Sequence, residues 1–220
     1  MVLAQGVAKG CNRRRGRPRE LSPAARETAI LDAAERLMVE KGLHGASMSA
    51  IAKAAGMSKR TLYEVFDNRA VLFEAWVRRA RTSFIRPLTA AERDLPLAER
   101  LSCMLSPQAA GGDHDTPFAV LRAVVREAGG HPDLGQIFLA EGPQQARRII
   151  AGELARAVAA GEIVLPDVDL AARILCDMAC ENPMDRLVDP DLPAPGAAAA
   201  TARITLAIRL FLDGIVQKTD

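Results

Sequence analysis

The stretch Ser47–Phe66 reads SMSAIAKAAGMSKRTLYEVF, and it decides the fold because it joins two short helical patterns through one glycine. In its first half, small and apolar side chains recur at the spacing of one buried helix face, at Met48, Ile51, Ala52 and Ala55. Gly56 follows, and glycine adopts a positive φ without a steric cost. The pattern predicts a helix over residues 48–55 that ends in a sharp turn.

The second half predicts another helix, over Lys59–Phe66. Ser58 precedes it as an N-cap, since a serine hydroxyl accepts from the free N–H groups of a first helical turn. We expect Leu62, Val65 and Phe66 to point inward. Basic and polar side chains remain exposed at the start of this helix, namely Lys59, Arg60, Thr61 and Tyr63. This order is typical of a helix-turn-helix, whose second helix enters the major groove of DNA. The alternative is an ordinary corner between two helices.

Composition favours an all-α protein. The 220 residues are 49% hydrophobic and only 4% aromatic, and they contain no long run of alternating β-branched residues. No apolar stretch reaches the roughly 18 residues that cross a bilayer, and no secretory signal opens the sequence. We therefore expect a cytoplasmic protein that does not bind a membrane.

Charge is divided unevenly along the chain. Residues 1–86 hold 17 basic and 8 acidic side chains, net +9, whereas the remainder holds 12 basic and 19 acidic, net −7. A basic amino-terminal part joined to an acidic body suits a protein that binds nucleic acid at one end.

An arginine-rich segment lies ahead of the predicted DNA-binding unit. It consists of Arg13, Arg14, Arg15, Arg17 and Arg19 around a Gly-Arg-Pro core. Proline keeps its predecessor extended, and narrow A·T-rich minor grooves attract inserted arginines. The segment resembles an AT-hook core and predicts a DNA-binding arm. The alternative is a solvated basic tail that adds only non-specific affinity.

Further helices surround this unit. Ser22-Pro23 predicts the start of a long helix that closes at Lys41-Gly42, and Ser47 caps the next helix, where Ser49 is a second candidate for phosphate. A fourth helix is predicted from Arg69 to about Arg86, with Trp76 in its apolar stripe. Three arginines are expected outside that stripe, at positions 78, 79 and 81.

The rest of the chain predicts helices over residues 97–105, 117–128, 133–160 with a kink near Gly142-Pro143, 170–188 with a kink at Pro183, and 197–216. In the second of these, Val125 is expected to point inward. The last two are apolar enough to be core or a dimer interface, and two-fold DNA sites favour the interface. The interface candidates are Ile174, Met178, Ile204, Ile208, Phe211, Leu212 and Ile215.

Catalytic and metal motifs are missing from the sequence. Cys11, Cys103, Cys176 and Cys180 form no C-x-x-C pair, and the three histidines at positions 44, 114 and 131 are scattered. The sequence therefore predicts no enzyme, metal site or cofactor. Cys176 and Cys180 lie one helical turn apart and are expected to pack as small hydrophobes, with a redox-sensing role as the alternative.

Residues 30–72 resemble the DNA-binding domain of the tetracycline-repressor (TetR) family of bacterial transcription regulators. The matching strings are ILDAAERLMVEKG, SMSAIAKAAGMSKRTLY and YEVFDNRAVL. Residues 118–215 resemble, more weakly, an AefR-like C-terminal domain through FLAEGPQQARRIIAGELARAVAAGEI and DLAARILCDM. The resemblance implies an all-α homodimer with three DNA-binding helices and a helical domain that encloses an effector pocket.

The resemblance also implies roles for single residues. Ser58, Lys59, Thr61 and Tyr63 match positions that contact DNA, chiefly its phosphates, and Arg60 matches a position from which a base is reached. Ser47 matches a cap that also binds phosphate. Arg69 stands where lysine is usual, and Val65 replaces a common histidine. Candidate pocket residues, each equally able to be plain core, are Met104, Phe118, Leu121, Arg122, Val125, Phe138 and Met178.

Together these observations predict four parts: a flexible basic arm over residues 1–20, a helix-turn-helix domain over 21–68, a connecting helix over 69–86, and an effector-binding and dimerisation domain over 87–220. The expected function is that of a homodimeric repressor released from a palindromic operator by a small-molecule effector. The alternative is an architectural DNA-binding protein that prefers A·T sequence and has no effector.

Overall fold

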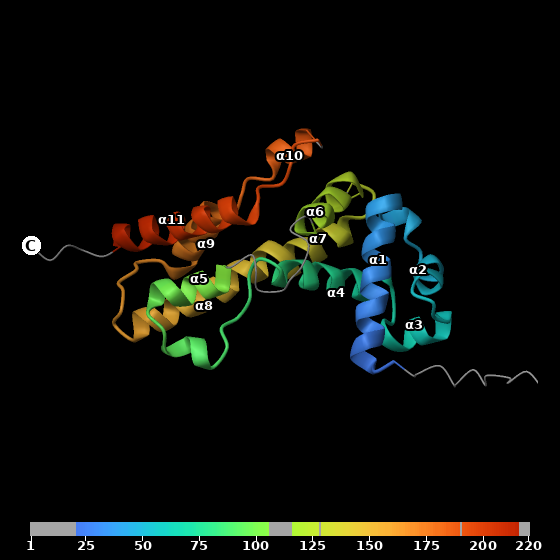
Figure 1. Ribbon diagram of the computed structural model, residues 1–220, viewed down its shortest axis with the longest axis horizontal. Helices are drawn as coiled ribbons and strands as arrows, with labels where there is room; N and C mark the ends of the chain where they lie inside the picture. The colour runs from blue at the N-terminus through green and yellow to red at the C-terminus, as the bar shows by residue number, and fades with distance from the viewer. Residues whose placement is uncertain (1–20, 106–115, 128, 190, 216–220) are drawn as a thin grey trace, which may run out of the picture.

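The computed structural model describes residues 21–105, 116–127, 129–189 and 191–215, and every regular element in these ranges is a helix (Figure 1). The predicted all-α class is confirmed. The amino-terminal helices are α1 (Pro23–Gly45), α2 (Met48–Ala54), α3 (Lys59–Val65) and α4 (Arg69–Thr82). The arginine-rich arm lies outside the described residues, as do His114 and Cys11.

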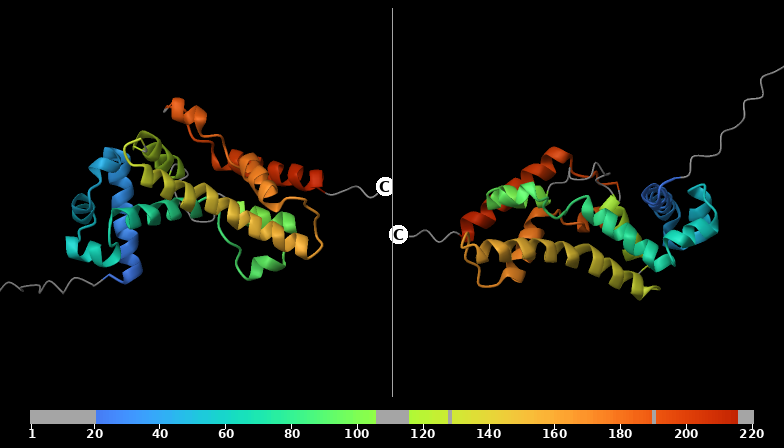
Figure 2. Two further views of the ribbon diagram at one scale, coloured as in Figure 1. Left: turned by 180° about the vertical axis from the view of Figure 1, so that it is seen from behind. Right: turned by 90° about the horizontal axis from the view of Figure 1, so that it is seen from below.

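The body follows with the 3-10 turn η1 (Ala91–Asp94), α5 (Leu97–Leu105), α6 (Thr116–Glu127), α7 (Pro132–Leu139), the π turn η2 (Ala140–Gln144), α8 (Gln145–Ala159), α9 (Val168–Ala179), α10 (Met184–Val188) and α11 (Ala197–Ile215). Helices α1–α3 form one end of the elongated molecule, and α5, α8, α9 and α11 form the other (Figures 1 and 2). Helices α4, α6 and α7 lie between them.

Helix α1 begins at the residue that the sequence indicates, but it continues to Gly45 beyond a kink at the predicted end, Gly42. The Ser22 hydroxyl accepts from the Ala25 N–H at 3.2 Å, and Pro23 occupies the first turn, where its missing N–H costs nothing. Gly42 leaves the helical conformation at φ 72°, as expected of a glycine that closes a helix.

Two predicted helices are shorter in the structure. Helix α4 ends at Thr82 rather than Arg86, because the hydroxyls of Thr82 and Ser83 donate to the carbonyls of Arg79 and Ala80 and the chain turns there. The predicted helix over 170–188 is divided into α9 and α10, since Cys180 is already extended ahead of Pro183. The kink expected near Gly142-Pro143 is present as the π turn between α7 and α8.

Two clusters of buried side chains form the core. One joins α1–α4 to α6 and α7, with Trp76 fully buried and Val124 and Leu134 contributed from the body. The other lies among α5, α8, α9 and α11. The first cluster packs α1, α2 and α3 directly onto the body, so a shift of α4 or α6 reaches α1 through shared apolar contacts.

Several side chains face differently from the prediction. Val125 is 58% exposed, because α6 turns Val124 and Ala123 toward the core instead. Ile204, Ile208 and Phe211 are buried inside this chain, against α5 and α9, and thus are core rather than exposed interface residues. Arg81 is 7% exposed and points inward from α4. Among the described residues, no helix combines the length and apolarity needed to cross a membrane.

Candidate DNA-binding surface and effector cavity

The turn between α2 and α3 is held by hydrogen bonds within a few residues. Gly56 has φ +66°, and the N–H groups of Gly56 and Met57 donate to the carbonyls of Lys53 and Ala52 at 3.1 and 2.9 Å. This is the Schellman arrangement, for which the sequence supplies the required glycine. Ser58 then caps α3 by accepting from the Thr61 N–H at 3.0 Å.

The predicted DNA-contacting side chains of α2 and α3 lie together on one end of the molecule. Ser47, Ser49, Ser58, Lys59, Arg60 and Tyr63 are exposed, and Thr61 is half-buried. The Arg60 side chain is 90% exposed, and its Nε donates to Glu64 at 3.1 Å. An exposed pair of this kind is weak, so the guanidinium can exchange the carboxylate for a base edge or a phosphate.

Arg69 is not fully exposed, as a residue that contacts only DNA would be. It is half-buried at the start of α4, and its guanidinium donates to the carbonyl of Leu43 in the last turn of α1, past the kink at Gly42. The phosphate contact expected of Arg69 stays a prediction, and any such contact would share the guanidinium with this backbone oxygen.

Glu127, the last residue of α6, holds the same turn from the body side. Its Oε1 accepts from the Leu43 N–H at 2.6 Å, and its Oε2 lies 2.8 Å from His44 Nδ1. His131 Nε2 lies 3.1 Å from His44 Nε2. The structure thus brings together two histidines that the sequence left scattered. Leu43 is bonded through its N–H to α6 and through its carbonyl to α4.

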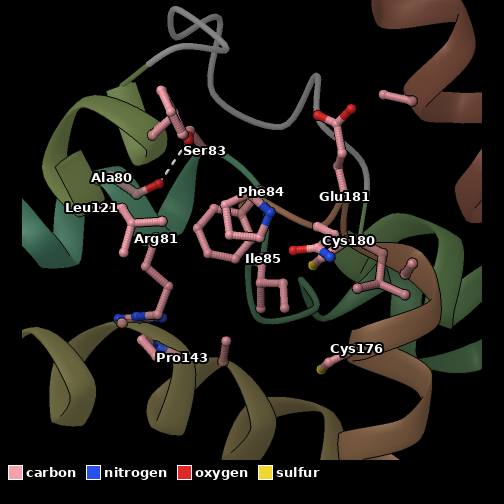
Figure 3. Close-up of a pocket in the computed structure, with 18 of the residues that line it drawn as sticks. Ala80, Arg81, Ser83, Phe84, Ile85, Leu121, Pro143, Cys176, Cys180 and Glu181 are labelled. Atoms are coloured by element: carbon pink, nitrogen blue, oxygen red, sulfur yellow. Dashed lines mark hydrogen bonds between the residues drawn. The ribbon is translucent and has the colours of Figure 1, made fainter. Parts of the chain in front are cut away.

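A cavity of about 730 Å³ lies in the body and is open to solvent on one side. Its walls come from α4, α6, the α7–α8 kink, α9, α10 and α11. Side chains that line it include Val77, Phe84, Ile85, Phe118, Leu121, Phe138 and Ile204. Figure 3 shows Phe84 and Ile85 near the centre of the lining and Leu121 at one side. The volume and the mostly apolar wall suit a small organic ligand.

Three of the seven predicted pocket residues line this cavity: Phe118, Leu121 and Phe138. The other four do not. Met104 is part of the second core cluster, Met178 packs against that cluster, and Val125 is exposed on the outer side of α6. Arg122 is exposed, with its guanidinium 5.1 Å from the Phe118 ring centroid. A one-residue error in the inward face of α6 accounts for both Arg122 and Val125.

Polar side chains in the cavity wall are mainly cationic. Arg81, Arg147, Arg186 and Arg203 line it, against Asp177 and Glu181. Cys176 of α9 and Cys180, the extended residue that follows the end of α9, line it as well (Figure 3). Burial raises the pKa of Cys176 to about 12 and also raises the pKa of Cys180. Both thiols therefore stay protonated near neutral pH and are poor nucleophiles.

Sequence reasoning did not identify Arg81 or Glu127. Arg81 was expected in solvent, yet its Nε donates to the Glu141 carbonyl at 2.8 Å, 60 residues away. The sequence carries no signal for this contact, because the proline at 143 removes the donor for a carbonyl earlier in the chain than that of Glu141. Within the described residues, no group of three or more histidine, cysteine, aspartate or glutamate side chains is arranged to hold a metal ion.

The fold and these two sites define a helix-turn-helix protein of the transcription-regulator class. Residues 30–76 match the family of bacterial regulatory proteins described as the tetR family, and residues 114–214 match the C-terminal domain of AefR-like transcriptional repressors. The chain belongs to the tetR family. The resemblance seen in the sequence is thereby confirmed.

Individual relatives cover different parts of the chain. The helix-turn-helix regulator Rv1255c of Mycobacterium tuberculosis is 52% identical over 50 residues, which are 23% of this chain and 25% of that protein. RutR of Escherichia coli strain K12 is 29% identical over 122 residues, 46% of this chain and 55% of RutR. The matches thus span a quarter to about half of these relatives' lengths.

Solved structures match over most of the chain. A TetR regulator from Agrobacterium tumefaciens aligns with a TM-score of 0.66 and 26% identity, covering 89% of this chain and 95% of that one. The flavonoid-responsive regulator FrrA aligns with a TM-score of 0.60 and 27% identity, covering 89% and 100%.

Proposed function

We propose that this protein is a homodimeric transcriptional repressor that binds a palindromic operator and is released when a small molecule occupies the cavity. The observation that carries the proposal is the double attachment of Leu43. This residue lies in the last turn of α1, shortly before α2, and it is bonded to the first residue of α4 and to the last residue of α6. Both of these helices also line the cavity.

The attachment gives a physical route from ligand to DNA. Val77, Ala80 and Arg81 face the cavity from α4, and Phe118, Val120 and Leu121 face it from α6. A ligand that pushes α4 and α6 apart moves Arg69 and Glu127, which bond the carbonyl and the N–H of the same residue, Leu43. Since packed side chains transmit displacements rather than absorb them, α2 and α3 are expected to follow.

The same linkage requires that ligand and DNA oppose one another. A ligand lowers operator affinity only by the factor by which it prefers the released arrangement, and DNA lowers ligand affinity by that same factor. Neither effect needs a new contact between the two molecules, which bind at separate sites.

Dimerisation is expected through α9 and α11. These adjacent helices carry large apolar side chains that this chain leaves exposed, namely Leu170, Ile174, Leu206 and Leu210 at 52%, 45%, 45% and 54%. Of the residues predicted from the sequence, Ile174 remains in this proposed interface, whereas Met178 and Leu212 are partly buried against the core and the Ile215 side chain lies outside the described residues. Exposed leucines of this kind favour a second copy as the cover.

A selection from random duplexes, followed by fluorescence anisotropy on the selected sequence, tests the proposal. We expect an inverted repeat with half-sites about one helical turn apart or a multiple of it. Protection of any A·T-rich sequence instead would support an architectural protein. The proposed release by a small molecule is contradicted if molecules that bind the protein, as shown by a raised thermal unfolding midpoint, leave its operator affinity unchanged.

The proposed dimerisation is tested separately. Replacing both Leu206 and Leu210 by glutamate is expected to convert a dimer into monomers in sedimentation velocity and to weaken operator binding. Val39→Glu is the control, because Val39 is 55% exposed on α1, away from α9 and α11. A wild-type chain that sediments as a monomer at micromolar concentration contradicts the proposed dimer.

A further inference from the structure

Two buried arginines in this protein have opposite surroundings. Arg81 and Arg100 are both 7% exposed. Arg100 donates from Nε to Glu153 at 2.7 Å and from a terminal nitrogen to Glu162 at 2.8 Å, so two carboxylates neutralise it. Arg81 donates to the carbonyl of Glu141, and none of the described residues places a carboxylate oxygen within 4.0 Å of its guanidinium. Arginine is rarely buried without such a partner.

The pKa values of the two side chains follow their surroundings. Hydrogen bonding to Glu162 raises the pKa of Arg100, whereas burial lowers the pKa of Arg81 and the more distant Glu141 offsets this only in part. A buried cation without an anion is unfavourable by several kcal/mol in general, and an anionic ligand group removes that cost.

Other charges around the cavity do not fill this role. Asp177 lies 3.6 Å from Arg147 and 3.9 Å from Arg173, so it is already shared between two arginines. Glu181 is exposed, and Figure 3 places it across the cavity from Arg81, whose guanidinium points toward Pro143. Arg203 donates to the carbonyl of Met178 at 3.1 Å. Among the described residues that line the cavity, four arginines stand against two carboxylates.

We propose that the effector is an amphipathic anion, with a carboxylate or comparable acidic group on Arg81 and an apolar body along Phe84, Phe118, Leu121 and Ile204. The inference rests on the proposed function, which it deepens by naming the class of effector. Arg81 belongs to α4, so the charged group of the ligand and the carbonyl of Glu141 compete for one guanidinium. Charge recognition and displacement of α4 then depend on the same residue.

The test uses two fluorescent probes with nearly the same aromatic body. One is the anion 1-anilinonaphthalene-8-sulfonate, and the other is neutral N-phenyl-1-naphthylamine. We expect the full-length protein to bind the anion more tightly, with one saturable site per chain, and decanoate to displace it where decanol does not. Arg81→Met keeps an unbranched apolar stem and removes the guanidinium, and it is expected to reduce the preference for the anion by about tenfold or more.

Control variants separate charge from structure. Arg209→Met removes an exposed arginine of α11 that does not line the cavity, and it should leave the preference unchanged. Arg81→Lys should restore part of the preference. Equal affinity for the two probes in the wild-type protein, or an unchanged preference in Arg81→Met, overturns the inference. Equal loss of both probes in Arg81→Met gives the residue a structural role and overturns it as well.

These measurements contain no DNA, so they are independent of the proposed repressor function. If the protein prefers the anion but its operator affinity does not change when the anion binds, the inferred effector class stands and the proposed release mechanism fails. If neutral flavonoids release the protein from DNA and anions are not preferred, the release mechanism stands and the inferred effector class fails.

Discussion

The helix-turn-helix and the cavity wall use polar side chains in opposite ways. In α2 and α3, the capping and surface bonds join residues three or four positions apart, such as Ser58 with Thr61 and Arg60 with Glu64, and the groups remain exposed. In the body, Arg81 bonds to a residue 60 positions away and Arg100 to residues 53 and 62 positions away, all in buried or half-buried surroundings. Local bonds keep a surface available to DNA, whereas long-range bonds fix how helices meet.

The largest effect that we expect is a loss of stability in the Arg100→Met variant. This change removes the buried one of the two arginines that pair with Glu153, which is 4% exposed, and leaves the half-exposed Arg156 as the other. Breaking a buried pair costs about 3–5 kcal/mol, and we expect a loss near the lower end because Arg156 remains. Urea denaturation followed by circular dichroism measures it. Arg81→Met is the matched control and is expected to lose little stability or to gain some, since it strands no carboxylate and removes a buried cation that has no anionic partner among the described residues. Equal losses in the two variants would contradict the distinction between them.

Arg60→Ala is expected to act on DNA binding and not on folding. Loss of a base contact costs on the order of 1–3 kcal/mol and relaxes preference at one or two positions of the operator, while loss of the exposed pair with Glu64 leaves stability nearly unchanged. Selection from random duplexes gives the first quantity and urea denaturation the second. An unchanged operator motif would show that Arg60 does not read bases.

Glu127→Gln tests the connection between the two regions. The carboxylate accepts from the N–H of Leu43 and bonds His44, and replacing it weakens charge-assisted bonds by about 1–2 kcal/mol. We expect operator affinity to fall and the response to ligand to shrink together, as measured by anisotropy with and without ligand. Glu74→Gln, which removes an exposed partner of Arg78 on α4, is the control. If the operator affinity of Glu127→Gln responds to ligand as in the wild-type protein, the coupling between the cavity and α2 and α3 does not depend on Glu127.

The smallest expected effect is the dependence of stability on pH from Glu92. Hydrogen bonds from Arg86 and Thr89 hold the pKa of Glu92 far below its usual value, so its stabilising contribution is complete above the unfolded-state pKa of about 4.3 and is lost as the pH falls below it. In thermal unfolding, Glu92→Gln should melt below the wild-type protein at pH 7, and the difference should begin to narrow as the pH falls from about 4.3 to 3, since it is lost fully only below the much lower folded-state pKa. If the difference in unfolding temperature between the two proteins is constant across this pH range, the ion pair between Arg86 and Glu92 is not its source.

Residues close in sequence decide most of what could be predicted. Gly56, Ser58, Ser22 and Gly42 act within one helical turn, so their caps and turns follow from residue type and spacing alone. The inward face of α6 was predicted one residue out of place at Val125, because an amphipathic helix with apolar residues at neighbouring positions allows two orientations. The core position of Ile204, Ile208 and Phe211 depends on α5 and α9, which a periodic pattern does not specify.

The residues of the cavity illustrate the same limit. Arg81 lies beside Arg78 and Arg79 in the sequence, and nothing in that run separates the one that is buried from its two neighbours. Its orientation follows from its bond to the Glu141 carbonyl, because the fold packs the π turn that contains Glu141 against α4. Glu127 likewise resembles any surface glutamate until the fold places it against a turn 84 residues away.

Trp76 has a practical consequence. It is the single tryptophan of the chain, it is fully buried on α4, and it packs edge-on against Phe73 at a centroid distance of 6.0 Å. Its indole nitrogen has no hydrogen-bond partner among the described residues. All tryptophan emission therefore originates from one apolar position on the helix that joins the DNA-facing end to the cavity. The unmodified protein carries its own optical reporter, in which a change of emission wavelength or lifetime would record movement of α4 in real time.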